Sequence, residues 1–432
     1  MARPNVTVII NDQSFVIPGT ESGGAFRAGF ISENGLISNL GLTSERSNGI
    51  MTISNLRDWF GKLSSQDPIA SGMTADGVWH HSNVPGGNAT GGTGMERWPQ
   101  GPTGSWEGEW WTVHNYLQYG GVAIVGSTGD EENTVSSTDS LSNKQVGLDG
   151  VVCMSSQSIG LTMGGASIGT KYYTNTTDIT NASAVVNLRE DCVGVFPYET
   201  GTAANDSVPA EPAADSEIPN NEYGIAIFGA KRFLGISKNP ESDILEMNCA
   251  PDVGGCLART DRLADPWMSP AGFKRGDILN TIRLVYNPTD AEQDTLFDAD
   301  INPVVVYPGE GTVLFGDKTL AGSTSSLSRI NVSRLFIYLK KIVGSAARSL
   351  LFEMNDEGTR SSFVNTVSPL LNRIKARRGI YDYKVVCDES NNTSDIIDSN
   401  QFVADVFIKP SKSINFIKIT FTNVNTAVDL NS

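Results

Sequence analysis

The sequence has few of the residues from which metal centres and nucleophilic sites are built. It holds five cysteines and three histidines among 432 residues. No cysteines form a C-x-x-C pair, and the two nearest, Cys249 and Cys256, are seven positions apart. A structural zinc site needs four converging ligands at short spacing. The pattern therefore predicts reduced, mostly buried thiols rather than a metal site.

The histidines are also poorly placed for chemistry. His80 and His81 are adjacent and would point in different directions on a strand, while His114 lies in a separate aromatic segment. No G-x-S-x-G elbow precedes a predicted helix, and the phosphate-binding pattern G-x-x-x-x-G-K-[ST] is absent. A Ser-His-Asp or Cys-His site would have to use one of these three histidines. We therefore expect no enzyme activity, no metal and no cofactor.

Positive charge and long apolar runs are scarce as well. Lys and Arg number 32 against 48 Asp and Glu, a net charge of −16 that argues against a general nucleic-acid binder. No apolar run approaches the roughly 20 residues that span a bilayer. The first ten residues lack a charged leader followed by an apolar core. We expect a protein that is made in a cytoplasm and is not inserted into a membrane.

Helix and strand patterns alternate along the chain, which predicts an α/β core. Two stretches rich in Gly, Ser and Thr, Lys62–Trp106 and Ser127–Asn181, interrupt the pattern and are expected to be inserted loops or lobes. The helix expected at Arg360–Arg378 should restart at Ser368-Pro369. The other main elements predicted are helices at Thr52–Gly61, Glu107–Tyr119 and Ile330–Val343, and strands at Ala25–Ile31, Val122–Val125, Tyr223–Phe228, Tyr383–Val386 and Phe402–Ile408.

Basic residues gather at the end of one predicted helix. Four of them, Arg373, Lys375, Arg377 and Arg378, lie within six positions. One interpretation is that they complement the helix macrodipole, each contributing about 0.3–1 kcal/mol. One or two cations would suffice for that, so four of them in an acidic chain equally favour a surface that meets an acidic partner. The sequence alone leaves both interpretations open.

Both ends of the chain carry β-type patterns. Asn5–Ile10 alternates apolar and polar residues, Phe15–Ile17 continues the pattern, and Ile414–Thr422 precedes a polar tail. Such arms are suited to adding a strand to another subunit's sheet through backbone hydrogen bonds. The alternative is pairing within one subunit. The arm residues expected to pair are Val6, Val8, Ile10, Phe15, Ile417, Ile419 and Phe421.

Several motifs, in a shared order, resemble the contractile tail sheath proteins of bacteriophages. Gly255–Asp261 precedes a segment similar to the family's W-x-x-P-A-G, and Leu314–Leu320 resembles a later G-x-R-T-L stretch in which Lys318 replaces the usual arginine. The resemblance is good from about Val185 onward, patchy before it, and absent in the two predicted insertions. The residues that match the first segment are Trp267, Pro270, Ala271 and Gly272.

The resemblance implies a multi-domain α/β (α+β) fold. Its core would combine N-terminal and C-terminal parts of the chain, with β-rich inserted lobes and extended terminal arms. The boundaries we expect are 1–20 for the N-terminal arm, 21–127 for the first part of the core with an inserted loop or lobe at 62–106, 128–181 for a projecting β-rich lobe, 182–420 for the second part of the core, and 421–432 for the C-terminal arm.

The resemblance also implies a non-enzymatic function. Such subunits form stacked hexameric rings around a tube and contract to drive it through the host envelope, as part of a virion assembled in the host cytoplasm. The implied partners are further copies of the chain, an acidic tail tube protein, and baseplate and tail terminator proteins. In the family, terminal arms complete the C-terminal sheet of neighbours and a basic helix touches the tube. Those roles would fall here to Val6–Ile17 and Ile417–Ser432, and to Arg373, Lys375, Arg377 and Arg378.

Two alternatives remain at the level of sequence. The chain could belong to the sheath of a tailocin or of an extracellular contractile injection system. It could instead be a β-rich glycan-binding surface protein that uses Trp79, Trp98 and Trp106 in its Gly-rich segment.

Overall fold

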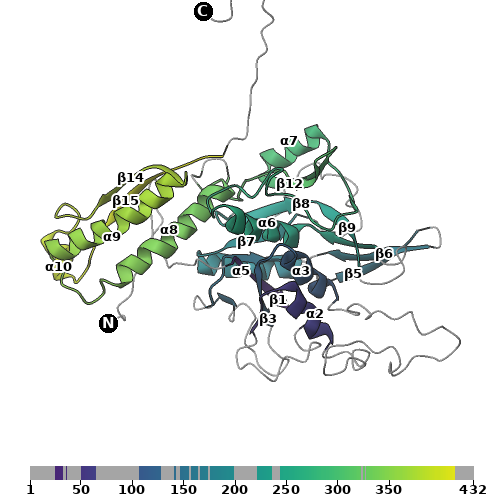
Figure 1. Cartoon of the computed structure of the whole chain (residues 1–432), viewed down its shortest axis with the longest axis horizontal. Coiled ribbons are helices and arrows are strands. Elements are labelled where there is room, and N and C mark those ends of the chain that lie inside the picture. Colours follow the sequence, from purple (N-terminus) through teal and green to yellow (C-terminus); the bar gives the residue numbers. More distant parts are fainter. Residues whose placement is uncertain are drawn as a thin grey trace, which may run out of the picture.

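The described part of the chain forms three β-sheets and a set of helices that cover them (Figure 1). The computed structural model describes residues 25–32, 36, 50–64, 107–127, 141–142, 146–154, 157–163, 166–173, 176–198, 221–235, 244–322, 325 and 327–413. Within these ranges the sheets have eight, five and two strands. None of the helices in the described part is long and apolar enough to cross a membrane.

The eight-stranded sheet is the centre of the body. Its six inner strands run parallel, and the strand at each edge is antiparallel to its neighbour. Inner strands such as VGVFP and GIAIF are buried at every position, as expected for a parallel sheet covered on both faces. In sheet order the strands are β13 (Gly311–Leu314), β12 (Ile301–Tyr307), β8 (Gly224–Phe228), β7 (Val193–Pro197), β4 (Gly150–Val152), β1 (Arg27–Ser32), β3 (Val122–Ser127) and β2 (Ile50–Ile53).

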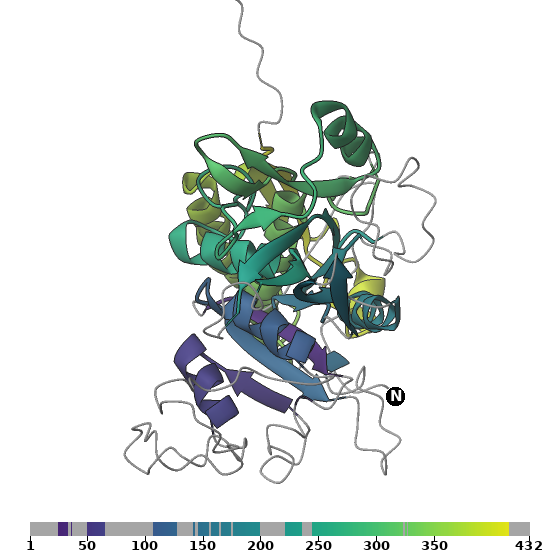
Figure 2. The ribbon, with the colours of Figure 1, turned by 90° about the vertical axis from the view of Figure 1, so that its right-hand side faces the viewer.

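Helices α5 (Thr176–Arg189) and α6 (Ala250–Leu263) pack on opposite faces of this sheet. A Cβ at Gly194 would lie 2.9 Å from Val186 of α5, while Gly254 of α6 lies against Val152. Gly194 pairs with Val151, the residue before Val152, and successive strand residues point to opposite faces. Helix α3 (Glu107–Leu117) packs beside α6, and Figure 2 shows the N-terminal elements, in purple, at the lower edge of the body.

The five-stranded sheet joins segments that are distant in sequence. Its order is β11 (Arg283–Leu284), β9 (Ala230–Leu234), β10 (Ile244–Asn248), β6 (Ala166–Tyr173) and β5 (Gln157–Met163). The hairpin β5–β6 falls in the stretch 128–181 expected as a projecting lobe, and β6 pairs with β10 in parallel. The same stretch also supplies β4 to the middle of the central sheet, between β1 and β7. Helix α5 crosses the expected boundary at residue 181.

The C-terminal lobe extends from one end of the body in Figure 1. It has its own apolar cluster, which includes Leu339, Phe363, Val367 and Leu371, with Trp267 packed against it. The lobe consists of α8 (Ile330–Arg348), α9 (Glu357–Ala376), β14 (Ile380–Val386), α10 (Ser394–Asp398) and β15 (Asp405–Pro410).

Helix α8 connects the lobe to the body. Ile330 and Ile337 of this helix join the main core, whereas Leu335, Leu339, Ile342 and Val343 join the lobe's cluster. Three of its cations contact the body. Lys340 Nζ donates to the Tyr223 hydroxyl at 2.9 Å, and Arg334 and Lys341 pair with Asp261 and Asp149. The lobe is therefore fixed to the body by packing and by buried or half-buried polar contacts.

Most of the predicted elements are present, and two predictions are wrong. The expected helix at Thr52–Gly61 begins later, as α2 (Leu56–Ser64), because residues 50–53 pair with β3 and the Asn55 side chain accepts from the Asp58 N–H at 2.9 Å. Helix α9 does not restart at Ser368-Pro369, since Pro369 lies inside one continuous helix. The prediction of buried free thiols is confirmed for all five cysteines.

Candidate assembly surfaces

The basic cluster predicted from sequence lies at the C-terminal end of α9. The helix ends at Ala376, Arg377 is its C-cap residue, and Arg378 adopts a left-handed conformation with φ of 63°. Gly379 turns the chain into β14, where a Cβ would lie 2.5 Å from Ile374 and 3.1 Å from the Trp267 ring. All four cations, Arg373, Lys375, Arg377 and Arg378, are exposed.

Half of these cations have partners within the chain. Lys375 Nζ lies 2.7 Å from Asp382, and its hydrogen bond is the main cause of the lowered pKa of that carboxyl. Arg377 lies 2.8 Å from Asp265, whose pKa is raised by burial, an effect that the guanidinium partly offsets. Arg373 and Arg378 have no ion-pair partner among the described residues. Their charges are therefore the ones available to another molecule.

The W-x-x-P-A-G segment forms the junction between body and lobe. The Trp267 indole is buried, and its Nε1 donates to the backbone oxygen of Arg377 at 3.1 Å. Gly272 has φ of 85°, which favours glycine, and its N–H donates to the Leu314 oxygen of β13 at 2.9 Å. Pro270 is buried and Ala271 half-buried between these two contacts. The segment thus ties β13 of the body to the basic end of α9.

The two-stranded sheet of the lobe offers two edges. β14 and β15 pair antiparallel from Ile380–Pro410 to Val386–Asp405. Within the described residues neither strand has a second neighbour. One face of this sheet rests on α9, since Ile380 and Val406 join the lobe's apolar cluster. An extended segment from elsewhere could add to either edge through backbone hydrogen bonds.

The terminal arms predicted from sequence lie outside the described residues. This applies to Val6, Val8, Ile10 and Phe15 at one end and to Ile417, Ile419 and Phe421 at the other. At the C-terminal end, residues 411–413 follow β15 and are held against the body by hydrogen bonds. The Asn331 side chain donates to the Ser411 oxygen at 3.2 Å, and the Ser413 hydroxyl donates to Asp317.

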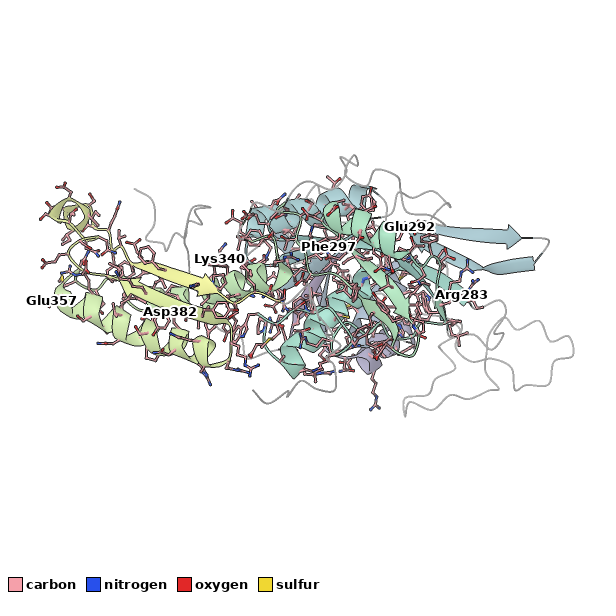
Figure 3. The ribbon with its side chains drawn as sticks, turned by 90° about the horizontal axis from the view of Figure 1, so that it is seen from above. Arg283, Glu292, Phe297, Lys340, Glu357 and Asp382 are labelled. Carbon is pink, nitrogen blue, oxygen red and sulfur yellow. The ribbon has the colours of Figure 1, made fainter. Side chains whose placement is uncertain are left out.

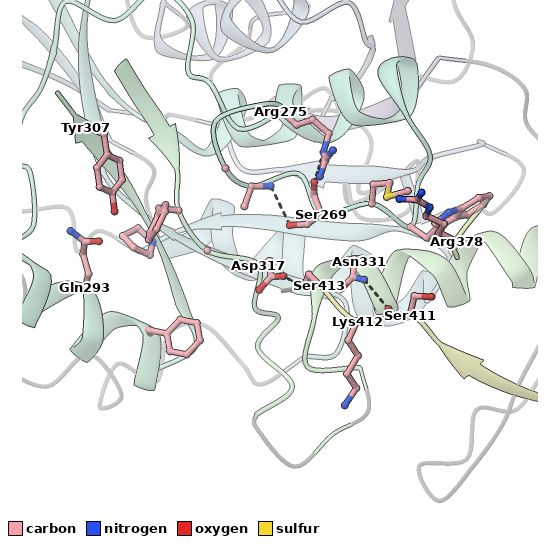
Figure 4. Close-up of a pocket in the computed structure, with 18 of the residues that line it drawn as sticks. Ser269, Arg275, Gln293, Tyr307, Asp317, Asn331, Arg378, Ser411, Lys412 and Ser413 are labelled. Atoms are coloured by element: carbon pink, nitrogen blue, oxygen red, sulfur yellow. Dashed lines mark hydrogen bonds between the residues drawn. The ribbon is translucent and has the colours of Figure 1, made fainter. Parts of the chain in front are cut away.

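A groove of about 1180 Å³ opens between the body and the root of the lobe (Figure 4). Gln293 and Tyr307 lie on one side and Arg378 on the opposite side. An aromatic surface forms part of the lining, where the Tyr307 ring lies 5.1 Å from that of the exposed Phe315. Sequence reasoning missed this groove because residues from α7 (Asp290–Asp298), β12, the W-x-x-P-A-G segment and β14 meet there only in the fold.

Sequence reasoning also missed an exposed apolar turn. Phe352 and Met354, between α8 and α9, are 86% and 78% exposed. The available signal was the placement of these two residues between the two helices, outside the apolar stripe of either.

The described residues contain no group of three or more His, Cys, Asp or Glu side chains arranged to hold a metal ion. His114 lies on α3 among aromatic rings, with its ring centroid 5.2 Å from that of Trp110. Burial lowers its pKa to about 4. It packs as a neutral core side chain.

Comparisons with known proteins find similarity to tail sheath proteins of phages. Residues 322–423 match the family model of the phage tail sheath C-terminal domain. The tail sheath protein of Vibrio phage KVP40 is 49% identical over 263 residues, which cover 57% of this chain and 39% of that protein. The tail sheath protein of Enterobacteria phage T4 is 37% identical over 281 residues, covering 62% and 42% respectively. The chain spans about two fifths of the length of these curated relatives.

Solved structures show the same fold. The sheath complex of PVC, an extracellular contractile injection system, in its contracted state superposes with a TM-score of 0.63 at 14% identity and covers 98% of each chain. The contracted helical sheath of the anti-feeding prophage gives 0.62 at 15% identity, covering 98% of this chain and all of the other. The chain is therefore similar in sequence to curated tail sheath proteins of phages, matches their C-terminal domain over residues 322–423, and shares the fold of solved contractile sheath subunits.

Proposed function

We propose that the chain is a structural subunit of a contractile phage tail sheath. It would polymerise as stacked hexameric rings around the tail tube and contract to drive that tube through the host envelope. The observation that carries the proposal is the identity of 37–49% to curated tail sheath proteins of phages. Further partners would be the baseplate and tail terminator proteins, and the subunit would form part of the virion after assembly in the host cytoplasm.

Strand addition would connect the subunits. The edges of β14 and β15 would accept the arms of neighbouring copies, Val6–Ile17 and Ile417–Ser432. The unpaired edges among the described residues support this proposal, as does the anchoring of residues 411–413, which fixes where the C-terminal arm starts. Backbone hydrogen bonds do not depend on side chains, so such links could persist while rings rotate against each other.

The basic end of α9 would contact the acidic tube before contraction. Arg373, Lys375, Arg377 and Arg378 are exposed, and two of them have no internal ion pair within the described residues. Exposed charge pairs contribute at most about 1 kcal/mol each and weaken with salt. Such contacts could hold an extended sheath in register and still break ring by ring on contraction. No nucleotide is required if the contracted lattice forms additional contacts.

Electron microscopy of the purified chain tests the proposal. We expect sheath-like tubes, with an axial repeat of rings, at high protein concentration or on added tail tube. Persistent monomers under both conditions would overturn it.

The runner-up is a sheath of a tailocin or of an extracellular injection system. The fold likeness to the PVC and anti-feeding prophage sheaths favours it, although at 14–15% identity that likeness speaks for the fold alone. Capsid and terminase genes beside the coding sequence would decide for a phage. The glycan-binding alternative gains no support, since Trp79, Trp98 and Trp106 lie outside the described residues.

A further inference from the structure

The turn between α8 and α9 presents two large apolar side chains to solvent. Phe352 is 86% and Met354 78% exposed, the two highest values among the large apolar residues described. Glu353 between them is exposed as well. We call Phe352, Glu353 and Met354 the knob. An exposed aromatic next to an exposed methionine is a typical feature of a protein-binding surface.

The backbone holds the knob in an unfavourable conformation. Phe352 has φ of 74°, a left-handed value that a bulky residue rarely adopts. Hydrogen bonds on both sides fix this turn. The Glu353 N–H donates to the Leu350 oxygen at 3.1 Å, and the Asn355 side chain donates to the Gln401 oxygen at 2.8 Å. The turn is therefore built to present the Phe352 ring outward rather than to bury it.

The groove between body and lobe is a hollow that is lined in part by aromatic rings. Its rings from Phe297, Tyr307 and Phe315 could receive a phenyl ring and a thioether, which both pack well on aromatic faces. The knob cannot reach the groove of its own chain. The knob lies just before the first residue of α9, and the groove includes Lys375 near the last residue of that helix. A helix of 20 residues keeps its two ends about 30 Å apart. Figure 3 shows Glu357 at the outer end of the lobe and Lys340 at its root.

The charges around knob and groove are complementary. Arg348 precedes the knob on α8, Glu353 lies within it, and Asp356 and Glu357 follow it; all four are exposed. One wall of the groove, from α7, carries Asp290 and Asp294. The opposite side carries Arg378, and Lys412 also lines the groove; both residues are exposed. A single orientation would place Arg348 against the acidic wall and the acidic residues on the side of Arg378.

We infer that the knob of one subunit docks in the groove of another copy of this chain. Because knob and groove are different surfaces, the contact is heterologous, and repeating it generates a ring or a helical filament. The inference rests on the proposed self-assembly and adds a side-chain contact to the strand addition. It assigns Phe352 and Met354 as the anchors and the pair Arg348 and Asp294 as a determinant of orientation.

Cysteine cross-linking tests the contact directly. The five native thiols are buried, so introduced exposed thiols are the ones that react. We expect the double variant Glu353→Cys with Gln293→Cys, which keeps both anchors, to give a ladder of covalent multimers on oxidation, because each copy carries one knob thiol and one groove thiol. The control is Glu353→Cys with Leu188→Cys, whose second site is 64% exposed on α5, away from the groove. An identical ladder from this control, or none from the test pair, would overturn the inference.

Substitution of the knob provides a second test, because it should lower the yield of assembled tubes without lowering the stability of the monomer. Phe352→Asn with Met354→Ser should leave the melting temperature of the monomer unchanged or higher, because asparagine tolerates the left-handed conformation. The same variant should lower the yield of assembled tubes at least tenfold. Normal tubes would overturn the inference while leaving the proposed sheath function intact. Wild-type protein that forms no tubes would instead count against that function.

Charge exchange checks the orientation. Arg348→Glu alone should reduce assembly, and adding Asp294→Lys should restore it. These residues lie outside the basic cluster at the end of α9, so tube binding does not enter the comparison. Failure of the double variant to recover, with its fold intact by circular dichroism, would rule out the proposed orientation.

Discussion

The indole N–H of Trp267 donates a hydrogen bond of 3.1 Å to the backbone oxygen of Arg377. This bond joins the segment most similar to the family motif with the basic end of α9. It also satisfies one of the carbonyl groups that a helix leaves unpaired at its C-terminus. The surface that carries the free cations is therefore positioned by a buried tryptophan of the body–lobe junction.

Trp267→Phe should lower the free energy of unfolding by about 1 kcal/mol more than a Trp→Phe substitution at a buried position whose indole N–H has no hydrogen bond. Trp110→Phe is that control, since its buried Nε1 has no partner in the described structure. The measurement is the free energy of unfolding in urea for both variants. Equal losses would show that the Trp267 bond contributes nothing net.

His114 should make the protein less stable as the pH falls. Burial depresses its pKa from 6.5 to about 4, so the unfolded chain binds a proton that the folded chain does not between these values. The stabilisation is complete above pH 6.5 and is lost toward pH 4, by about 3 kcal/mol in total. His114→Phe keeps an aromatic ring and removes the titration. Its unfolding free energy should fall less steeply over this window, and a slope equal to that of the wild type would contradict the assignment.

Pro369→Ala should stabilise α9. The proline is exposed inside a continuous helix and has no N–H for the Asn365 oxygen, so alanine should raise the unfolding free energy by up to about 3 kcal/mol. Ser361→Ala, an exposed position in the same helix, should gain no more than about 0.5 kcal/mol. Thermal unfolding of both compares them. A Pro369→Ala protein that melts no higher than Ser361→Ala would indicate that the helix depends on the proline.

Deleting Met1–Thr20 should leave a folded monomer that does not polymerise. The described core begins at residue 25, and the proposed role of the deleted arm is strand addition to a neighbour. Circular dichroism checks the fold, and electron microscopy checks for tubes. Tubes of normal length from the truncated chain would refute the arm proposal.

Reversing Arg373 to Glu should weaken association with the tail tube more than reversing Lys375, which already pairs with Asp382. The effect should shrink as salt rises from low to physiological strength, because exposed charges are screened. Co-sedimentation with the tube measures it, and Lys384→Glu on β14 is the control for an exposed cation elsewhere in the lobe. Unchanged binding by Arg373→Glu would favour the helix-dipole interpretation of the cluster.

The local sequence pattern was sufficient to predict the elements that depend on residues within a single segment. The amphipathic stripe of residues 330–343 predicted α8, and the aromatic run after Glu107 predicted α3. Patterns failed where a distant partner decided the outcome. Pairing with β3 converted residues 50–53 into a strand, and packing of Val367 and Leu371 in the lobe kept α9 continuous through Pro369.

The sequence by itself determined the similarity to tail sheath proteins, the buried thiols and the concentration of cations near residue 375, because these depend on residue identity and order. Only the tertiary structure decided which cations have no ion pair among the described residues, how the Trp267 segment supports them, and that Phe352 and the groove lie toward opposite ends of α9. Those relationships depend on contacts between residues far apart in sequence, and no local periodicity encodes them.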